Sequence, residues 1–412
     1  MNFSQQTLLH PVTICEVMSD RTPTRREFTT QGALAAALAA GLAGCTGNGD
    51  TGGNGNGNGN GSGSEEGVVE FGGIATVDAG DWSDFTDQTG WDVNFSTISN
   101  APGELLSTMI AGGGRQLYDL LAPVGGIQPP LASQGALSPI DTDRLDNWDR
   151  QYDYWESEEG REFVSHEGDI YGVPTVWQGD SIAYLPGETG EIDSYGALFD
   201  DEYAGQVAIE DNYTTAGQKT AMYLDHEGIE DIDNPANMTE SEFETVVDFL
   251  IEQKESGQFR TMWSGFENAV SLMAEGEVVV MDTWEPVVFS LRDQGIEAEY
   301  AEPEEGYLLW AMVDYLVNPE ESRSDAHEEA VYDFLDWHLA GWYGATITQQ
   351  TGYMTNPAAI DYAEQSDSFD ADEIRDVHEG VQERFEIGGS WQQRWPDERE
   401  AYEEQWERLR LA

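Results

Sequence analysis

The sequence predicts an α/β fold, and three observations support that class. Short apolar runs typical of strands alternate along the chain with stretches in which apolar residues recur at helical spacing. This alternation covers 68–412, a body long enough for two domains. The whole chain also holds 13 tryptophans, so its aromatic side chains can build a large core.

The first part of the body shows the alternation directly. Three strands are predicted from short runs of apolar or β-branched residues: 68–71, 93–97 and 118–121. Between them, the amphipathic spacing of 81–89 and of 105–110 predicts two helices. The glycine run at 112–114 ends the second helix, because glycine readily adopts the left-handed conformation found at helix C-termini.

The later elements carry clear signals for helix starts. Thr239 and Glu242 have the spacing of a capping box, and the apolar face of the helix that follows extends over 243–251. Ser324 is placed to cap another helix, whose apolar positions reach Leu339. Two further strands are predicted: 278–281 and 307–310.

The N-terminal segment resembles an export signal. Arg25 and Arg26 precede an apolar run at 33–43, which ends at Leu-Ala-Gly-Cys45. This order is that of a twin-arginine (Tat) signal followed by a lipoprotein processing site. The apolar run is too short to be a membrane span, which takes about 20 apolar residues. We therefore expect 1–44 to be a signal peptide.

Processing at Cys45 would place the mature protein outside the cytoplasm. A two-chain lipid on this cysteine would hold it at the extracellular face of the cell membrane, since a single chain binds only marginally. Glycine, asparagine and serine dominate 45–67, which predicts a flexible linker. The first 17 residues fit no signal and are interpreted as preceding the true start at Met18. Cys45 is then the only mature cysteine, so no intramolecular disulfide is expected.

The composition is strongly acidic. The chain has 80 Asp and Glu residues against 18 Lys and Arg, a formal net charge of −62, and its only lysines are Lys219 and Lys254. Because the acidic residues are spread along the body, we interpret them as the adaptation of an extreme halophile to high salt, where self-repulsion is screened. Unfolding in low salt is expected. This charge excludes nucleic-acid binding, which requires a basic face, but it does not indicate a cationic ligand.

The chain lacks the usual signatures of catalysis and metal binding. Its six histidines show no metal-ligand spacing, and no cysteine stands near any of them. It has no Gly-x-Ser-x-Gly elbow, no phosphate loop, and no Gly-x-Gly-x-x-Gly motif after a strand. We therefore expect neither an enzyme nor a cofactor. One enzymatic alternative stays open, an extracellular glycan-active protein, because carboxylate pairs abound in so acidic a chain.

Four aromatic residues are the candidates for ligand contact. Trp177, Trp284, Trp310 and Tyr353 each lie near the end of a predicted strand or in a turn. In open α/β sheets, ligands bind beyond the carboxyl ends of the strands. The alternative for each of these residues is an ordinary place in the core.

The segments around these aromatics resemble the spermidine/putrescine-binding proteins of ABC importers, within the type II solute-binding proteins. The resemblance covers the body from Phe71 to the C-terminus, and the order and spacing of its pieces carry it. Those pieces are Tyr118-Asp119-Leu120, Tyr171-Gly172-Val173-Pro174 with Trp177, Gly276-Glu277-Val278 running to Trp284 and Arg292, Pro303-Glu304-Glu305-Gly306 running to Trp310, Thr351-Gly352-Tyr353-Met354-Thr355-Asn356, Trp391-Gln392 and Tyr402-Glu403-Glu404.

The resemblance implies a two-lobed type II periplasmic-binding-protein fold with a central ligand cleft and two crossing segments. The first lobe would contain 68–178 and 311–345, and the second 179–310 and 346–412. The protein would be a monomer that closes on its ligand by a hinge motion and presents the closed form to a membrane permease.

The resemblance also implies a set of ligand-binding residues. Trp284, Trp310, Tyr353 and Gln392 fall where polyamine binders place cleft aromatics and a glutamine. The positions of the family's acidic residues hold Asn212, Thr215 and Met312, and two aromatic positions hold Gly73 and Gly126. Asp180, Asp211 or Asp314 could replace the lost carboxylates. The predicted ligand-binding residues are Trp177, Gln178, Asp180, Asp211, Asn212, Thr215, Trp284, Trp310, Tyr353 and Gln392.

The prediction is therefore a lipid-anchored receptor that captures a small solute, foremost a polyamine-like or other organic amine, and delivers it to an ABC permease. A sugar, a thiamine-like compound or ferric ion stays open as the ligand. The alternative function is a surface glycan-binding or sensory solute-binding protein that is not coupled to transport.

Overall fold

A computed structural model describes residues 67–99 and 102–412 of the chain. The expected export signal with Arg25 and Arg26, the lipid-modified Cys45 and the linker lie outside the described residues. Within the described part of the chain, no helix combines the length and the apolar character needed to cross a membrane.

Ten strands of the described residues form one mixed sheet. From one edge to the other, its main path is β2 (Asp92–Thr97), β1 (Val68–Gly73), β3 (Leu120–Ala122), β11 (Leu308–Leu316), β6 (Gly172–Tyr184), β9 (Val280–Thr283), β7 (Val207–Glu210) and β8 (Phe259–Trp263). Two short strands join this path from the side: β10 (Glu299–Tyr300) pairs with β6, and β12 (Trp391–Gln392) pairs with β11. The hairpin of β4 (Ser165–His166) and β5 (Asp169–Ile170) stands apart from it.

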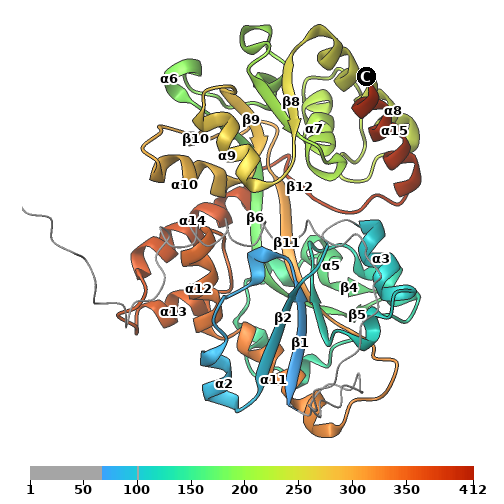
Figure 1. Ribbon diagram of the computed structural model, residues 1–412, viewed down its shortest axis with the longest axis vertical. Helices are drawn as coiled ribbons and strands as arrows, with labels where there is room; N and C mark the ends of the chain where they lie inside the picture. Colours follow the sequence, from blue (N-terminus) through green and yellow to red (C-terminus); the bar gives the residue numbers. More distant parts are fainter. Residues whose placement is uncertain (1–66, 100–101) are drawn as a thin grey trace, which may run out of the picture. The chain divides into compact units, whose positions relative to one another are not determined.

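The strands β6 and β11 cross between the two ends of this sheet (Figure 1). They are antiparallel partners, and every residue of both is buried. The sequence analysis gave no strand over this whole range, and Pro174 within it lacks the N–H that a central strand needs. The register shifts between Met312 and Val313, opposite Pro174, so a β-bulge accommodates the proline. The two strands provide the crossing segments that the sequence led us to expect.

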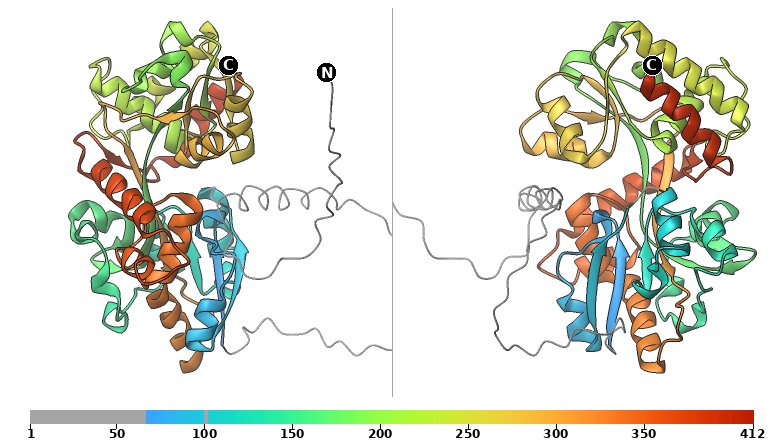
Figure 2. Two further views of the ribbon diagram at one scale, coloured as in Figure 1. Left: turned by 90° about the vertical axis from the view of Figure 1, so that its left-hand side faces the viewer. Right: turned by 45° about the vertical axis from the view of Figure 1, so that its right-hand side comes forward.

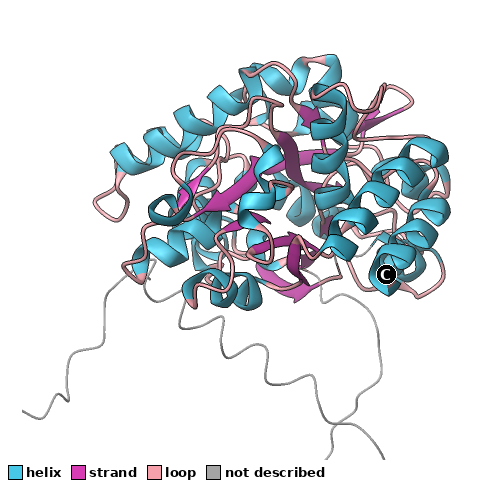
Figure 3. Ribbon diagram, turned by 90° about the horizontal axis from the view of Figure 1, so that it is seen from above, coloured by secondary structure: helices cyan, strands magenta, loops and turns pink. Residues whose placement is uncertain are grey.

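Helices surround the strands, as the view from above shows (Figure 3). The α-helices are α2 (Ser83–Thr89), α3 (Pro102–Ile110), α4 (Gln128–Ser133), α5 (Glu158–Val164), α6 (Pro186–Thr189), α7 (Gln218–His226), α8 (Glu240–Ser256), α9 (Phe266–Ala274), α10 (Glu285–Asp293), α11 (Asp325–His338), α12 (Gly341–Thr351), α13 (Ala358–Ala363), α14 (Ala371–Glu386) and α15 (Arg399–Leu411). Shorter helical turns are η1 (Ala75–Val77), η2 (Gly114–Gln116), η3 (Thr142–Arg144), η4 (Trp148–Arg150), η5 (Asp153–Glu156), η6 (Tyr195–Leu198), η7 (Asp201–Tyr203) and η8 (Tyr213–Gly217).

The local signals in the sequence are confirmed where they concern helix starts. Thr239 and Glu242 form the reciprocal capping box at the start of α8, which ends at Gly257 with φ 85°. The Ser324 side chain accepts a hydrogen bond from the backbone N–H of His327 and so caps α11. The five predicted strands correspond to β1, β2, β3, β9 and β11.

Separate cores pack against the two ends of the sheet. Around β1 and α11, the ring of Phe71 meets Phe334 edge-on with ring centres 5.2 Å apart. Around β7 and α8, Phe243 stacks on Tyr402 at 3.7 Å. The second contact holds α15 beside α8, although the two helices are far apart in the sequence (Figure 2). α12, by contrast, packs on α11 and η1 at the first end of the sheet.

Candidate functional site

The predicted residues of β6 point to two different faces of the sheet. Trp177 stacks on Trp155 with ring centres 4.3 Å apart, in the core that includes Phe163 and Val313. Side chains of a strand alternate between faces, so Gln178 and Asp180 share a face that Trp177 does not. The structure therefore separates Trp177 from the other predicted residues of this strand.

Asp180, Trp310 and Tyr353 come together beside the crossing strands. Trp310 Nε1 donates a hydrogen bond to Asp180 Oδ1 at 2.8 Å, and its ring meets Tyr353 edge-on at 4.9 Å. The exposed fractions of Asp180, Trp310 and Tyr353 are only 1%, 4% and 6%. Burial raises the pKa of Asp180 to about 6, although the charge of Lys219 and the hydrogen bond from Trp310 oppose that rise.

A buried ion pair lies next to this group. Lys219, on α7, donates hydrogen bonds to Asp282 Oδ1 on β9 and, at 3.1 Å, to the carbonyl oxygen of Ser181. Neither Lys219 nor Asp282 has measurable exposure to solvent. Burial disfavours the ammonium form of Lys219, but the charges of Asp282 and Asp180 outweigh that cost and raise its pKa. An internal ammonium group thus neutralises Asp282.

Glu210 completes the cluster from the C-terminal end of β7. Its backbone N–H donates to Asp282 Oδ2 at 3.1 Å. Burial, reinforced by the charge of Asp282, raises the pKa of the Glu210 carboxyl to about 8. Its Oε2 atom is buried and makes no hydrogen bond within the described structure, so this carboxyl keeps an unfilled acceptor.

Trp284 lies at the edge of the same region, between β9 and α10. Its ring meets that of Trp263 edge-on at 5.0 Å, and Trp263 Nε1 donates to the carbonyl oxygen of Asp282 at 2.8 Å. Unlike Trp310, Trp284 is only partly buried. It is therefore the tryptophan of this group that a solute can reach without displacing the core.

Gln178 is held by an ion pair that joins α10 to α14. The Arg384 guanidinium donates two hydrogen bonds to the Glu285 carboxylate, at 2.7 and 2.8 Å. It also donates to Gln178 Oε1 at 2.8 Å, and Gln178 Nε2 donates to Glu285 at 2.8 Å. Such bidentate geometry fixes all three side chains, so the amide of Gln178 is committed to this network.

Two of the three aspartates that could replace the family's acidic residues instead form hydrogen bonds away from the aromatic pair. Asp211 accepts hydrogen bonds from Trp406 Nε1 and from Arg410 Nε, each at 2.8 Å. Asp314 is buried against His338 Nδ1. Of the three candidates, Asp180 is the one that the structure brings beside the aromatic pair.

Asn212 and Thr215 build the loop after β7 instead. Asn212 Oδ1 accepts a hydrogen bond from the Thr214 backbone N–H at 2.9 Å and so caps η8. The Thr215 hydroxyl donates to the carbonyl oxygen of Asn212 at 3.2 Å. These contacts position the segment that follows Glu210 and place η8 ahead of Lys219 on α7.

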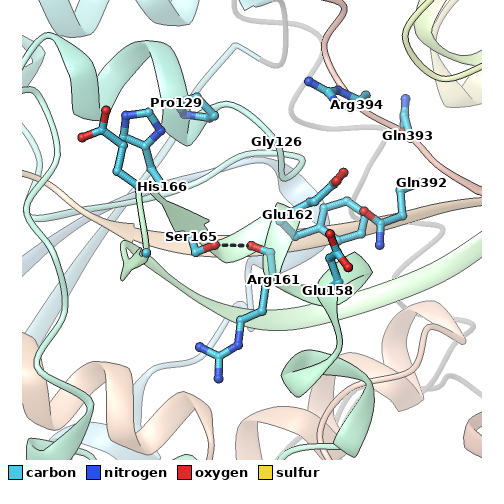
Figure 4. Close-up of a pocket in the computed structure, with 13 residues that line it drawn as sticks. Gly126, Pro129, Glu158, Arg161, Glu162, Ser165, His166, Gln392, Gln393 and Arg394 are labelled. Carbon is cyan, nitrogen blue, oxygen red and sulfur yellow. Dashed lines mark hydrogen bonds between the residues drawn. The ribbon is translucent and has the colours of Figure 1, made fainter. Parts of the chain in front are cut away.

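Gln392 lines a large hollow of about 850 Å³ together with Gly126 (Figure 4). Its backbone pairs with Leu309, next to Trp310, but its side chain donates a hydrogen bond to the Tyr154 hydroxyl at 2.5 Å. Residues of α5 and of the β4–β5 hairpin line most of the rest of the hollow, with Pro129, Gln393 and Arg394. Gly126 has φ 89°, a left-handed conformation that glycine adopts without strain.

The sequence analysis missed the residues that carry most of the charge here. These are Lys219, Glu210, Asp282 and Arg384. One signal was available: Lys219 is one of two lysines in a chain with 80 acidic residues. Glu210 and Asp282 gave no signal among so many acids, even though each lies in a short buried strand.

Across residues 67–99 and 102–412, no group of three His, Cys, Asp or Glu side chains is arranged to hold a metal ion. The cluster around Asp180 is instead a mixed site of aromatic rings, carboxyls and one ammonium group. Aromatic rings and carboxyls of this kind can contact a polar or cationic organic group.

Comparison with known proteins identifies the chain's relatives. The family described as bacterial extracellular solute-binding proteins matches residues 82–376. A putrescine/agmatine-binding protein of Pseudomonas aeruginosa is 24% identical over 303 residues, which cover 68% of this chain and 76% of that protein.

Solved structures with the same fold have little sequence in common with the chain. The spermidine/putrescine ABC transporter substrate-binding protein PotD of Streptococcus pneumoniae superposes with a TM-score of 0.65 at 16% identity, covering 84% of this chain and 98% of that one. The Tp0655 (TpPotD) lipoprotein of Treponema pallidum gives 0.64 at 13% identity, with 84% and 100% covered. The expected type II periplasmic-binding-protein fold is confirmed by these likenesses.

Proposed function

The chain belongs to the bacterial extracellular solute-binding proteins, and from that premise we propose that it captures a small organic amine carrying one positive charge and delivers it to an ABC permease. It is a substrate-binding protein and not an enzyme. The names of its relatives, binders of putrescine, agmatine and spermidine, support the amine class.

The observation that carries the proposal is the grouping of Asp180, Trp310 and Tyr353 beside Glu210. Aromatic faces attract an ammonium group by about 0.5–2 kcal/mol per contact. The Glu210 Oε2 atom, buried and without a hydrogen bond in the described structure, can accept a hydrogen bond from the ammonium group. Trp284, partly exposed, lies at the edge where a solute would enter.

The charge of the cluster favours one positive charge on the ligand. Lys219 already neutralises Asp282. With a pKa of about 6, Asp180 is mostly ionised at neutral pH, whereas Glu210, with a pKa of about 8, is mostly protonated. About one negative charge remains for the ligand, and a second buried ammonium would lack a partner.

We further propose that the ligand closes two lobes about β6 and β11. The lobe boundaries expected from the sequence are 178/179, which lies within β6, and 310/311, which lies within β11. The helices α12–α14 belong with the first lobe in this proposal, rather than with the second, because α12 packs on α11 and η1 and α14 packs on β6. The protein would act as a monomer whose closed form meets the permease.

The binding proposal is tested by two ligands with the same four-carbon chain. In molar NaCl, n-butylamine should raise the melting temperature of the full chain, and putrescine, with a second ammonium group, should raise it much less. Trp284→Ala should weaken n-butylamine binding at least tenfold, because it removes an aromatic face, while changing the melting temperature little. The control is Trp342→Ala, a partly buried tryptophan that packs on Trp337 instead.

A larger shift with putrescine than with n-butylamine would refute the single-charge proposal. Equal binding by wild type and Trp284→Ala would remove this region as the solute site.

We also propose that the protein is exported by the Tat route and held by a lipid on Cys45 at the extracellular face of the membrane. The order of Arg25, Arg26, apolar run and Cys45 supports this. Cys45→Ser should release the protein into the medium, as measured by its loss from the detergent phase of a Triton X-114 partition. Thr51→Ser, a change in the linker that follows Cys45, should leave it in that phase. Retention of both variants would contradict lipid anchoring.

A further inference from the structure

A second pocket lies on the face of β6 that carries Trp177. Its volume is about 460 Å³, and η5, β6 and α14 supply most of its lining. Successive side chains of a strand point to opposite faces of the sheet. Trp177 and Asp180 are an odd number of positions apart in β6, so they lie on opposite faces. This pocket is therefore separate from the cluster around Asp180.

Four of the nine residues that line this pocket are aromatic. Tyr152 and Trp177 lie with ring centres 5.4 Å apart and planes tilted by 49°. Phe385 meets Tyr154 edge-on at 4.8 Å and lies 6.5 Å from Trp177. Rings inclined to one another in this way present faces to a common space, the arrangement that attracts an ammonium group through cation–π interactions.

The charge of the lining favours a cation as well. Asp153 and Glu386 are exposed at the pocket, and none of the described residues that line it is basic. The Tyr152 hydroxyl is hydrogen-bonded to His378 Nδ1 at 2.9 Å. Burial lowers the pKa of His378 to about 3, so the imidazole is neutral and brings no competing positive charge.

Two buried polar atoms of the lining have no partner within the described structure: Trp177 Nε1, a donor, and Gln151 Oε1, an acceptor. Trp177 is 2% exposed, so water outside the pocket does not satisfy its N–H group. Buried polar groups are normally hydrogen-bonded, and a pair left open in one pocket indicates a ligand with an oxygen for Trp177.

We propose that this pocket is a second binding site, for a small organic ammonium compound that also carries a hydroxyl or carbonyl oxygen. The rings of Tyr152, Trp177 and Phe385 would surround the ammonium group. The oxygen would accept the hydrogen bond from Trp177 Nε1, and Asp153 and Glu386 would attract the cation from solution. This site does not depend on the amine-binding role proposed for the cluster around Asp180.

Choline is the probe, since it combines a quaternary ammonium with a hydroxyl. Its uncharged isostere, 3,3-dimethyl-1-butanol, has the same shape without the charge. Isothermal titration of the full-length Trp284→Ala variant in molar NaCl, in which the other site is weakened, should show saturable choline binding in the millimolar range or tighter. The isostere should bind at least tenfold more weakly.

Adding Phe385→Leu should weaken choline binding at least tenfold, because one aromatic face is lost while most of the side-chain volume stays. Glu386→Gln, at an exposed position, should weaken it less and make it less dependent on salt. The melting temperature of each variant reports whether it folds. Absence of saturable choline binding, equal binding of the isostere, or indifference to both substitutions would overturn the proposal. If wild type binds choline and the Trp284→Ala variant does not, choline binds at the other site, and the proposal is overturned as well.

Discussion

Replacing Lys219 with methionine is expected to destabilise the protein by about 3–5 kcal/mol, the usual cost of removing one partner from a buried ion pair. The substitution keeps most of the side-chain volume and removes only the ammonium group. It leaves Asp282 buried and uncompensated, with Asp180 and Glu210 close enough to raise its energy further. Because the pair is shielded from solvent, molar salt does not screen this loss.

The measurement is the free energy of unfolding from urea titrations at pH 7 in molar NaCl. The control is the same substitution at Lys254, whose ammonium group donates to the carbonyl oxygens of Leu409 and Arg410 near the surface. Lys254→Met should cost less than about 1 kcal/mol. The double variant Lys219→Met/Asp282→Asn should recover most of the loss, because it removes the unpaired charge. Similar losses at the two lysines would show that Lys219 is not a buried countercharge.

Relative to wild type, Glu210→Gln is expected to leave stability unchanged near pH 4 and to give an advantage that grows between pH 4.5 and 8 and is greatest above pH 8. The pKa of Glu210 in the folded protein is about 8, above its ordinary value of 4.5. The protonated carboxyl therefore contributes its full stability below pH 4.5, and this contribution is lost as the pH rises to 8. Between pH 4.5 and pH 8, the free energy of unfolding falls by about 1.4 kcal/mol per pH unit. Glutamine resembles the protonated carboxyl and cannot ionise.

The difference in unfolding free energy between wild type and Glu210→Gln should be followed from pH 4 to pH 9 in molar NaCl. The general acidity of the chain also weakens the protein as the pH rises, but it acts on both proteins alike. Glu255→Gln, at an exposed position of α8, should track wild type throughout. A constant difference between wild type and Glu210→Gln across this range would mean that Glu210 titrates normally.

Much of the fold could be predicted because its signals are local. The capping box of Thr239 and Glu242 and the cap formed by Ser324 each act within one helix, so the sequence shows them directly. β6 was the main omission. Its Pro174 argues against a strand, and a β-bulge at Thr175, the residue of β6 that has no partner in β11, accommodates it.

The site was predicted only in part. Trp284, Trp310 and Tyr353 were found from their positions near strand ends, and the structure groups Trp310 with Tyr353 and Asp180. Trp177, predicted for the same region, lies on the other face of β6. A one-residue difference along a strand reverses the face, and strand boundaries read from sequence are not that accurate.

The sequence by itself determined the α/β class, the acidic composition, the helix starts and the aromatic residues available for a ligand. These follow from periodicity, capping chemistry and residue counts, which need no knowledge of distant neighbours. Only the tertiary structure decided which of 80 acidic residues matter, because a carboxyl acquires its role from burial and partners. Asp211 is bound by Arg410, Asp282 by Lys219, and Glu210 keeps an unfilled acceptor, although all three are acids at strand ends.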